Sequence, residues 1–290
     1  MKTVSHAYAK LNLTLDVISK APDGYHDMLM LMQGASLCDD VSIKAGSGEG
    51  RVSIRSGRSY IPSDGRNIAS KAASLFLGER RISEYDIEID VTKRIPVCSG
   101  LGGGSSDAAA VLRGMNEMFG EGMTADELRR LGEKLGSDVP YCVTFGTVLA
   151  EGRGERLTAL CDMPECSIVI CKPHFSISTP ELFKELDEKG IGSHPDTEGA
   201  MAALAAGDIC ALAEKMENVF EQVLGDREKA ISSIKKTMSE SGAFGAVMSG
   251  TGSAVFGLFG DADLSQTAAE KLRTRYEDVF LCRTIKCIDI

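Results

Sequence analysis

Residues 100–110, GLGGGSSDAAA, place four glycines and two serines directly before an alanine-rich stretch. The following apolar side chains recur at helical spacing, which predicts a helix that ends at Gly120: Ala108, Val111, Leu112, Met115 and Phe119. The first turn of a helix exposes unpaired backbone N–H groups and about half a positive charge, and glycines let an anion approach that backbone closely. We therefore predict that this helix begins at a phosphate-binding loop.

The residues around the loop allow two interpretations. The alternation of Tyr85, Ile87, Ile89 and Val91 predicts a strand before it, which completes a strand–loop–helix unit. Two common phosphate motifs do not fit, because a P-loop requires a lysine after its last glycine and the dinucleotide motif requires glycine where Ser105 stands. The alternative is a flexible loop that binds nothing and whose helix is capped by Ser105 or Ser106.

Residues 7–17 alternate between apolar and polar side chains, which is typical of a half-buried strand. Lys10 and Asn12 fall on its polar face, where they either carry function or simply meet solvent. The sequence TADE from Thr124 predicts a capping box that opens a helix ending near Gly136. Elsewhere we expect helices at 66–77, 208–224, 226–240 and 262–274, strands at 167–171 and 279–287, and a strand–turn–strand unit at 246–259. Helices and strands mix in both halves, which favours an α+β fold with antiparallel pairing.

Composition limits the class of protein. A chain of 290 residues has room for one large domain or two ordinary ones, and its net charge of −10 disfavours a general nucleic-acid binder. No apolar run approaches the roughly 20 residues that span a membrane, and the start carries no secretory pattern. The nine cysteines are scattered and form no CxxC pair, which predicts buried thiols in a reducing cytoplasm rather than zinc ligands or disulfides.

Three ordered blocks resemble a known superfamily. The segment PVCSGLGGGSSDAA at 96–109 resembles the ATP-binding signature of the GHMP kinases. The blocks AYAKLNL at 7–13 and MSGTGSAVFG at 248–257 are similar to two further motifs of that superfamily. PDGYHDM at 22–28 and LGSDVPYCV at 135–143 are similar to the branch that phosphorylates a cytidine diphosphate ester of methylerythritol, in non-mevalonate isoprenoid synthesis.

The resemblance implies both architecture and reaction. We expect an N-terminal, ribosomal-protein-S5-domain-2-like domain at 1–158, a C-terminal, ferredoxin-like domain at 159–290, and an active site in the cleft between them. The reaction it implies is transfer of the γ-phosphoryl group of ATP, with Mg2+, to the 2-hydroxyl of the methylerythritol moiety. Asp138 is then the base that accepts the hydroxyl proton, and Lys10 keeps that carboxylate ionised and steadies the transferred charge.

The resemblance also assigns binding residues. ATP is expected to contact Pro96, Val97, Cys98, Ser99, Gly100, Leu101, Gly102, Gly103, Gly104, Ser105 and Ser106, with Asn67 near adenine and Ser106 near Mg2+. Tyr25 and Phe183 are expected to enclose the cytosine, while His26 reads its edge. Asn12 and Thr179 help to place the sugar or diphosphate, and the acceptor is further enclosed by Gly250, Thr251, Gly252 and Ser253.

Simpler interpretations and rival functions stay open. Asp138 is also explained as a polar residue in the turn after a helix, and Phe183 as a side chain of the hydrophobic core. Residues 250–253 are also explained as a β-turn that binds no ligand. A homoserine-kinase-like enzyme with a small acceptor would need no base-stacking pocket, and a silent nucleotide-binding regulator would not need both Lys10 and Asp138. The partners we expect are small molecules, not nucleic acid or membrane, for a monomer or weak homodimer.

Overall fold

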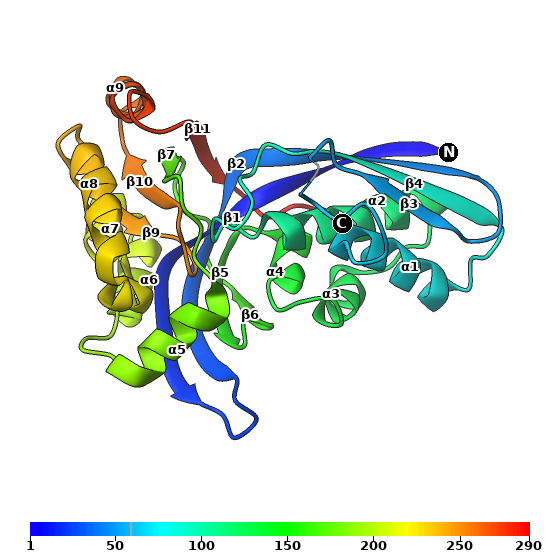
Figure 1. Ribbon diagram of the computed structural model, residues 1–290, viewed down its shortest axis with the longest axis horizontal. Coiled ribbons are helices and arrows are strands. Elements are labelled where there is room, and N and C mark those ends of the chain that lie inside the picture. Colours follow the sequence, from blue (N-terminus) through cyan, green and yellow to red (C-terminus); the bar gives the residue numbers. More distant parts are fainter. Residues whose placement is uncertain (59) are drawn as a thin grey trace.

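The computed structural model describes residues 1–58 and 60–290. Two long antiparallel strands, β1 (Lys2–Lys20) and β2 (His26–Ser47), run through the middle of the molecule, as Figure 1 shows. Four further strands extend this N-terminal sheet: β3 (Val52–Arg55), β4 (Tyr85–Thr92), β5 (Thr147–Gly152) and β6 (Arg156–Ala159). The turn between β1 and β2 projects from the body of the protein, and its tip extends past α5 (Thr179–Lys189).

One layer of helices covers the N-terminal sheet (Figure 1): α1 (Ile68–Arg80), α2 (Gly103–Phe119), α3 (Ala125–Glu133) and α4 (Val139–Thr144). The helix α2 is the central one, and its residues 108–112 are completely buried. It ends as predicted at Gly120, whose φ of 61° is left-handed. The predicted capping box is also confirmed, because Thr124 and Glu127 exchange both expected hydrogen bonds at the start of α3.

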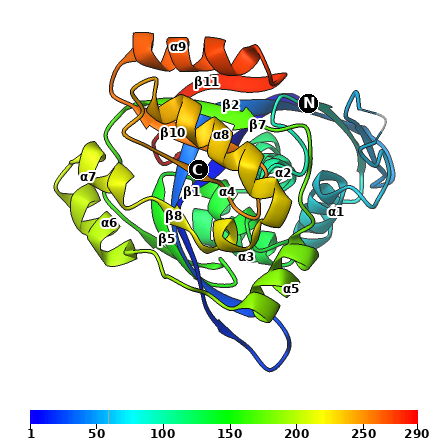
Figure 2. The same cartoon turned by 60° about the vertical axis from the view of Figure 1, so that its left-hand side comes forward.

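The C-terminal half forms a second antiparallel sheet in the order β9-β10-β7-β11. Its strands are β7 (Ser167–Lys172), β9 (Gly245–Met248), β10 (Val255–Phe259) and β11 (Asp278–Ile285), while the short β8 (Glu217–Asn218) pairs with β1. The helices are α6 (Thr197–Ala205), α7 (Ile209–Glu214), α8 (Glu228–Ser239) and α9 (Ala262–Arg273), with 3-10 turns η1 (Val219–Val223) and η2 (Gly225–Arg227). Figure 2 shows α8 and α9 packed beside each other on this sheet.

The two halves share strands. At its end, β11 pairs with β2 through Thr284 and Ile285, so the two sheets join into one network. Beyond β11 the chain returns to the N-terminal half, where the N–H of Ile288 donates to the Thr144 carbonyl at 2.7 Å. The predicted α+β fold is confirmed. The domain division at 158/159 falls at the end of β6 and stays a prediction.

Two predictions about local structure are wrong. The strand β1 is not half-buried, because every residue from 9 to 17 is buried, including the polar Lys10 and Asn12. The predicted helix at 208–224 ends instead after α7, and Asn218 lies in an extended conformation beside β1. The side chain of Asn218 donates to the carbonyls of Met248 and Gly250, both at 2.8 Å, and these tertiary bonds favour the extended backbone over a helix. In the described part of the chain, no helix has the length and apolarity to cross a membrane.

Candidate active site

A cleft of about 1080 Å3 lies where β1, the glycine loop, the start of α4, the start of α5 and the loop between β9 and β10 meet. Residues from both halves of the chain line it. Most of the predicted site residues are among them: Lys10, Tyr25, His26, Cys98, Gly100, Gly102, Ser105, Asp138, Thr179, Phe183, Gly250, Thr251 and Gly252. The fold therefore brings the separate sequence blocks to one cavity.

Lys10 and Asp138 form a pair at the inner wall of this cleft. The Lys10 ammonium lies 3.9 Å from a carboxylate oxygen of Asp138, and it donates to the Asn12 side-chain carbonyl at 2.7 Å. Lys10 and Asn12 are two residues apart on a strand, so their side chains share one face. The Lys10 side chain is only 5% exposed, whereas Asp138 is 33% exposed at the start of α4, where it makes no capping bond. An oriented ammonium thus lies beside a carboxylate that a ligand in the cleft can reach.

The glycine loop packs directly against the loop between β9 and β10. Gly100 has a left-handed φ of 79°, and a Cβ atom there would lie 2.0 Å from the Ser249 carbonyl oxygen. The Ser249 hydroxyl donates to the Gly100 carbonyl at 3.0 Å, and the Lys10 N–H donates to the Leu101 carbonyl at 3.0 Å. Since only glycine fits this approach, Gly100 lets two distant loops form one wall of the cleft.

The first turn of α2 does not follow the serine-capping alternative. Its N-cap is Gly102, which has a left-handed φ of 68° and no side chain to cap the helix. The Ser106 hydroxyl is buried and, within residues 1–58 and 60–290, has no hydrogen-bond partner. The N–H groups of this turn and one buried hydroxyl therefore remain available to an anion or to a metal ion bound with it.

The β9–β10 loop is held by a network of side chains. The Gly250 N–H donates to the Asn12 side chain at 3.0 Å, and the Thr251 and Thr179 hydroxyls are 2.7 Å apart. The buried Ser253, within this loop, donates its hydroxyl to the Phe175 carbonyl at 2.6 Å, and this bond fixes the loop to the segment before α5. Asn12 is also completely buried, and it links the loop to Lys10 rather than facing the cavity.

Aromatic rings gather at the outer end of the cleft. His26 stacks on Phe183 with ring centres 4.6 Å apart, and its ring nitrogen lies 2.8 Å from an Asp187 oxygen. Hydrogen bonds from Lys20 and then His26 hold the pKa of Asp187 below its usual range. Tyr25 is 58% exposed, and the Arg153 guanidinium lies 3.9 Å from its ring centre. Here one face of Phe183 already contacts His26, and enclosure of a base by Tyr25 and Phe183 stays a prediction.

Sequence reasoning missed several side chains that shape this site. Lys20, Arg153 and Lys184 line the outer end of the cleft, where they form ion pairs with Asp187, Asp23 and Glu188. Asn218 donates to the Gly250 carbonyl and so holds the β9–β10 loop, while Ser249, within that loop, ties it to Gly100. Lysines and arginines are common on every surface, and Asn218 follows a helix-like stretch, so no local pattern distinguishes these residues.

A buried charge cluster supports the glycine loop from the sheet side. The Lys93 ammonium lies 2.5 Å from Asp39 and 2.7 Å from Asp107, which is in the first turns of α2. Asp39 also accepts the backbone N–H groups of Arg94 and Ile95, which fixes the chain just before the loop. Burial raises the pKa of Asp107 to about 7, although Lys93 opposes this effect.

The remaining predicted ATP contacts do not line this cavity. Asn67 caps α1, because its side chain accepts the Ala69 N–H at 2.9 Å and donates to the Pro62 carbonyl at 2.9 Å. The others lie in the glycine loop or the first turn of α2, and their role toward ATP stays a prediction: Pro96, Val97, Ser99, Leu101, Gly103, Gly104 and Ser106.

Comparisons with known proteins agree with this arrangement. Residues 67–146 match the GHMP kinases N terminal domain, and residues 200–278 match the GHMP kinases C terminal model. A 4-diphosphocytidyl-2-C-methyl-D-erythritol kinase of Clostridium botulinum (strain Alaska E43 / Type E3) is 44% identical over 96% of this chain and 99% of its own. The enzyme of the same name from Clostridium novyi (strain NT) is 42% identical, again over 96% of this chain and 99% of its own.

Solved structures are similar along the whole chain. A crystal structure of 4-(cytidine 5'-diphospho)-2C-methyl-D-erythritol kinase has 31% identity and a TM-score of 0.80, and covers 98% of this chain and 99% of its own. Homoserine kinase from Cytophaga hutchinsonii has the same fold, with 20% identity, a TM-score of 0.74 and coverage of 99% and 96%. The predicted resemblance is confirmed: the chain belongs to the GHMP kinases, and within them to the family of 4-diphosphocytidyl-2-C-methyl-D-erythritol kinases.

Proposed function

We propose that the chain transfers the γ-phosphoryl group of ATP to the 2-hydroxyl of 4-(cytidine 5'-diphospho)-2-C-methyl-D-erythritol, a step of the non-mevalonate route to isoprenoid precursors. The names of its full-length relatives support the substrate. One observation of the structure carries the chemistry: the ammonium of Lys10 lies 3.9 Å from the carboxylate of Asp138, in a cleft that also contains the glycine loop.

Phosphoryl transfer requires that the protein position the two substrates, stabilise the transferred charge and provide a group that receives the hydroxyl proton. We assign proton acceptance to Asp138, because its carboxylate faces the cleft and makes no capping bond. We assign charge stabilisation to Lys10, since a buried ammonium held by Asn12 needs little reorganisation when negative charge moves toward it.

The phosphate end of ATP is proposed to lie at the start of α2. The exposed N–H groups of this turn, together with the left-handed Gly100 and Gly102, suit a bound polyphosphate. The unpartnered, buried hydroxyl of Ser106 fits Mg2+ or a phosphate oxygen held with it, and we propose Ser106 for that role. When bound, Mg2+ neutralises charge on the phosphates.

The cytidine diphosphate end of the acceptor is proposed to lie at the outer end of the cleft. Lys20, Arg153 and Lys184 offer N–H donors to a diphosphate, which would take the place of their present carboxylate partners. The exposed ring of Tyr25 can stack on a base, and the His26–Phe183 pair offers a second aromatic surface. A small acceptor such as homoserine would leave this outer end without contacts.

Mass spectrometry of products tests the proposal, with Mg-ATP and a panel that contains the cytidine diphosphate ester, homoserine and mevalonate. We expect a phosphorylated product from the cytidine ester alone. Asp138→Asn and Lys10→Ala should each lower kcat by about 10²–10⁴-fold, because each removes one part of the proton-transfer and charge-stabilising machinery. Asp126→Asn, an exposed carboxylate on α3, serves as the matched control and should leave kcat unchanged.

Other outcomes identify the rivals. Phosphorylated homoserine would replace the proposed acceptor, while ATP binding without any product would indicate a regulator. We further propose that the protein acts in the cytoplasm as a monomer or weak homodimer, in keeping with cysteines that are all free in the described chain. Light scattering coupled to gel filtration measures that oligomeric state.

A further inference from the structure

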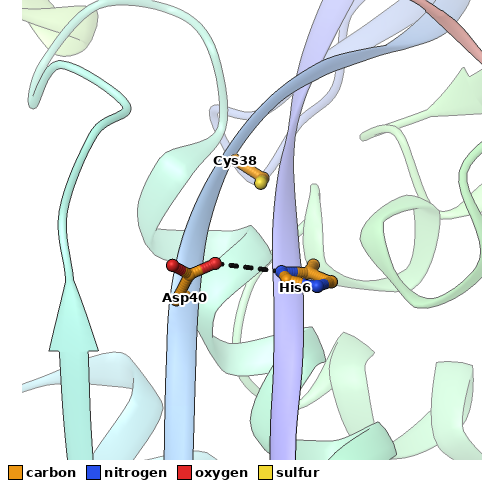
Figure 3. Close-up of side chains that lie close together, drawn as sticks. All are labelled: His6, Cys38 and Asp40. Atoms are coloured by element: carbon orange, nitrogen blue, oxygen red, sulfur yellow. Dashed lines mark hydrogen bonds and ion pairs between the residues drawn. The ribbon is translucent and has the colours of Figure 1, made fainter.

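Three side chains with different metal-binding atoms converge outside the cleft. His6 comes from β1, while Cys38 and Asp40 come from β2, and Figure 3 shows the Cys38 sulfur between the two strands and a dashed contact from Asp40 to His6. A ring nitrogen of His6, the sulfur of Cys38 and a carboxylate oxygen of Asp40 all lie within 4.8 Å of one another. None of the three lines the catalytic cleft, so the proposed kinase chemistry does not account for the cluster.

The backbone fixes this convergence. In the β1–β2 ladder His6 pairs with Asp40, and Tyr8 pairs with Cys38. Side chains of directly opposed residues point to the same face of a sheet, and so do residues two apart on one strand. His6, Cys38 and Asp40 therefore share a face whatever their rotamers, and two long hydrogen-bonded strands hold their Cα atoms in place.

We propose that His6, Cys38 and Asp40 bind one divalent zinc ion, with water as the fourth ligand. Imidazole nitrogen, thiolate sulfur and carboxylate oxygen are the three donor types that zinc takes in proteins. On one tetrahedral zinc ion, such atoms lie about 3.3–3.6 Å apart, from the usual bond lengths. The His6 nitrogen and the Asp40 oxygen are 3.0 Å apart, and no pair exceeds 4.8 Å, so rotation of side chains suffices to close the site.

The partners of Asp40 leave one of its oxygens for the metal. Its Oδ1 atom faces His6, whereas Oδ2 accepts a hydrogen bond from Arg94 at 2.5 Å. Zinc replaces only the His6–Asp40 contact, and Arg94 remains as the outer partner that orients the carboxylate. The Cys38 thiol gives up its proton to solvent when it binds the metal. The His6 side chain is 53% exposed and that of Asp40 is 31% exposed, so the ion and its water can reach the site from solvent.

A bound ion would join β1 to β2 just before the irregularity between Tyr8 and Ala9, which in turn precedes Lys10. Zinc that binds only the native state stabilises it by an amount that grows with the logarithm of the zinc concentration relative to its Kd. The bound zinc should therefore stabilise the pairing of β1, the strand that carries Lys10, with β2. This site is separate from any magnesium bound with ATP.

Cobalt(II) titration tests the proposal, because a thiolate bound to Co2+ gives a charge-transfer band that identifies sulfur as a ligand. We expect one equivalent of Co2+ to produce this band in the intact protein and zinc to displace it. Cys38→Ser should abolish the band, and His6→Gln and Asp40→Asn should each weaken binding by at least about tenfold. Cys161→Ser and Cys210→Ser, which remove exposed thiols elsewhere, are the matched controls and should retain it.

Thermal unfolding provides an independent readout. Zinc should raise the Tm of the intact protein and of both control variants, but not that of Cys38→Ser or His6→Gln. The proposal is overturned if the cobalt band survives in Cys38→Ser, if it disappears in a control variant, or if the intact protein shows no band at micromolar Co2+. Circular dichroism of each variant verifies that β1 and β2 have folded.

Discussion

Replacement of Gly100 by alanine is the most direct test of how the two halves of the cleft meet. At Gly100 a Cβ atom would lie 2.0 Å from the Ser249 carbonyl oxygen and 3.0 Å from the Gly252 nitrogen. Both are backbone atoms, so no side-chain rotation can relieve the clash. The glycine loop and the β9–β10 loop must therefore move apart by about 1 Å in Gly100→Ala, which is the scale on which catalytic geometry fails.

The cost follows from two contributions. A left-handed backbone costs an L-residue about 1–2 kcal/mol, and Gly100 has a φ of 79°. Separation of the loops also removes the hydrogen bond from the Ser249 hydroxyl to the Gly100 carbonyl, which contributes about 1 kcal/mol. We expect Gly100→Ala to lower the free energy of unfolding by about 2–3 kcal/mol and kcat by about 10²-fold.

Gly104→Ala is the matched control within the same loop and helix. Gly104 lies in α2 without a left-handed φ, and the nearest atom to its added Cβ would be Ile68 Cγ2, at 3.7 Å. Alanine favours a helix over glycine by up to about 1 kcal/mol, so the expected change in stability has the opposite sign. Urea unfolding measures both variants, with equal m values taken as the sign that the comparison is valid. An unchanged midpoint for Gly100→Ala, or equal losses in the two variants, would refute the argument.

Two further predictions concern the outer cleft and the buried charges. Tyr25→Ala should raise the KM for the cytidine substrate more than the KM for ATP, because the exposed ring lines the outer end of the cleft. Equal changes in the two KM values would contradict this. Tyr60→Ala, at an exposed tyrosine outside the cleft, is the control. Because burial raises the pKa of Asp107 to about 7, the folded protein holds a proton there that the unfolded chain has lost, so its unfolding free energy falls as pH rises between about 4 and 7. Asp107→Asn removes this contribution. In urea unfolding across that range, the free energy of unfolding of the variant should rise relative to that of the intact protein by up to about 1.4 kcal/mol per pH unit. A difference that does not change with pH would contradict the raised pKa of Asp107.

Local patterns predicted much of the fold. The alternation through Ala7–Val17, the turn at Gly120 and the capping box at Thr124 each depend on residues within one strand, turn or helix, and each is present. The α+β class followed from the order of such elements. The glycine segment at 100–110 likewise predicted the start of α2, because backbone freedom before an alanine-rich run is a local property.

The lining of the cleft depended on residues far apart in the chain. The sequence marked Lys10 and Asp138 only through family resemblance, and the structure places them 3.9 Å apart across 128 positions, the difference between their residue numbers. It also stacks Phe183 on His26 and extends Asn218 beside β1, where helical spacing predicted a helix.

What the sequence alone determined, then, was most of the local elements and the glycine-rich entrance to α2, since these arise from neighbouring residues; binding of an anion there stays a prediction. Only the tertiary structure decided that β1 is buried on both faces and that Ser249 meets Gly100. The physical reason is that burial and long-range hydrogen bonds depend on which segments pack together, and no period or motif within one segment specifies its neighbour.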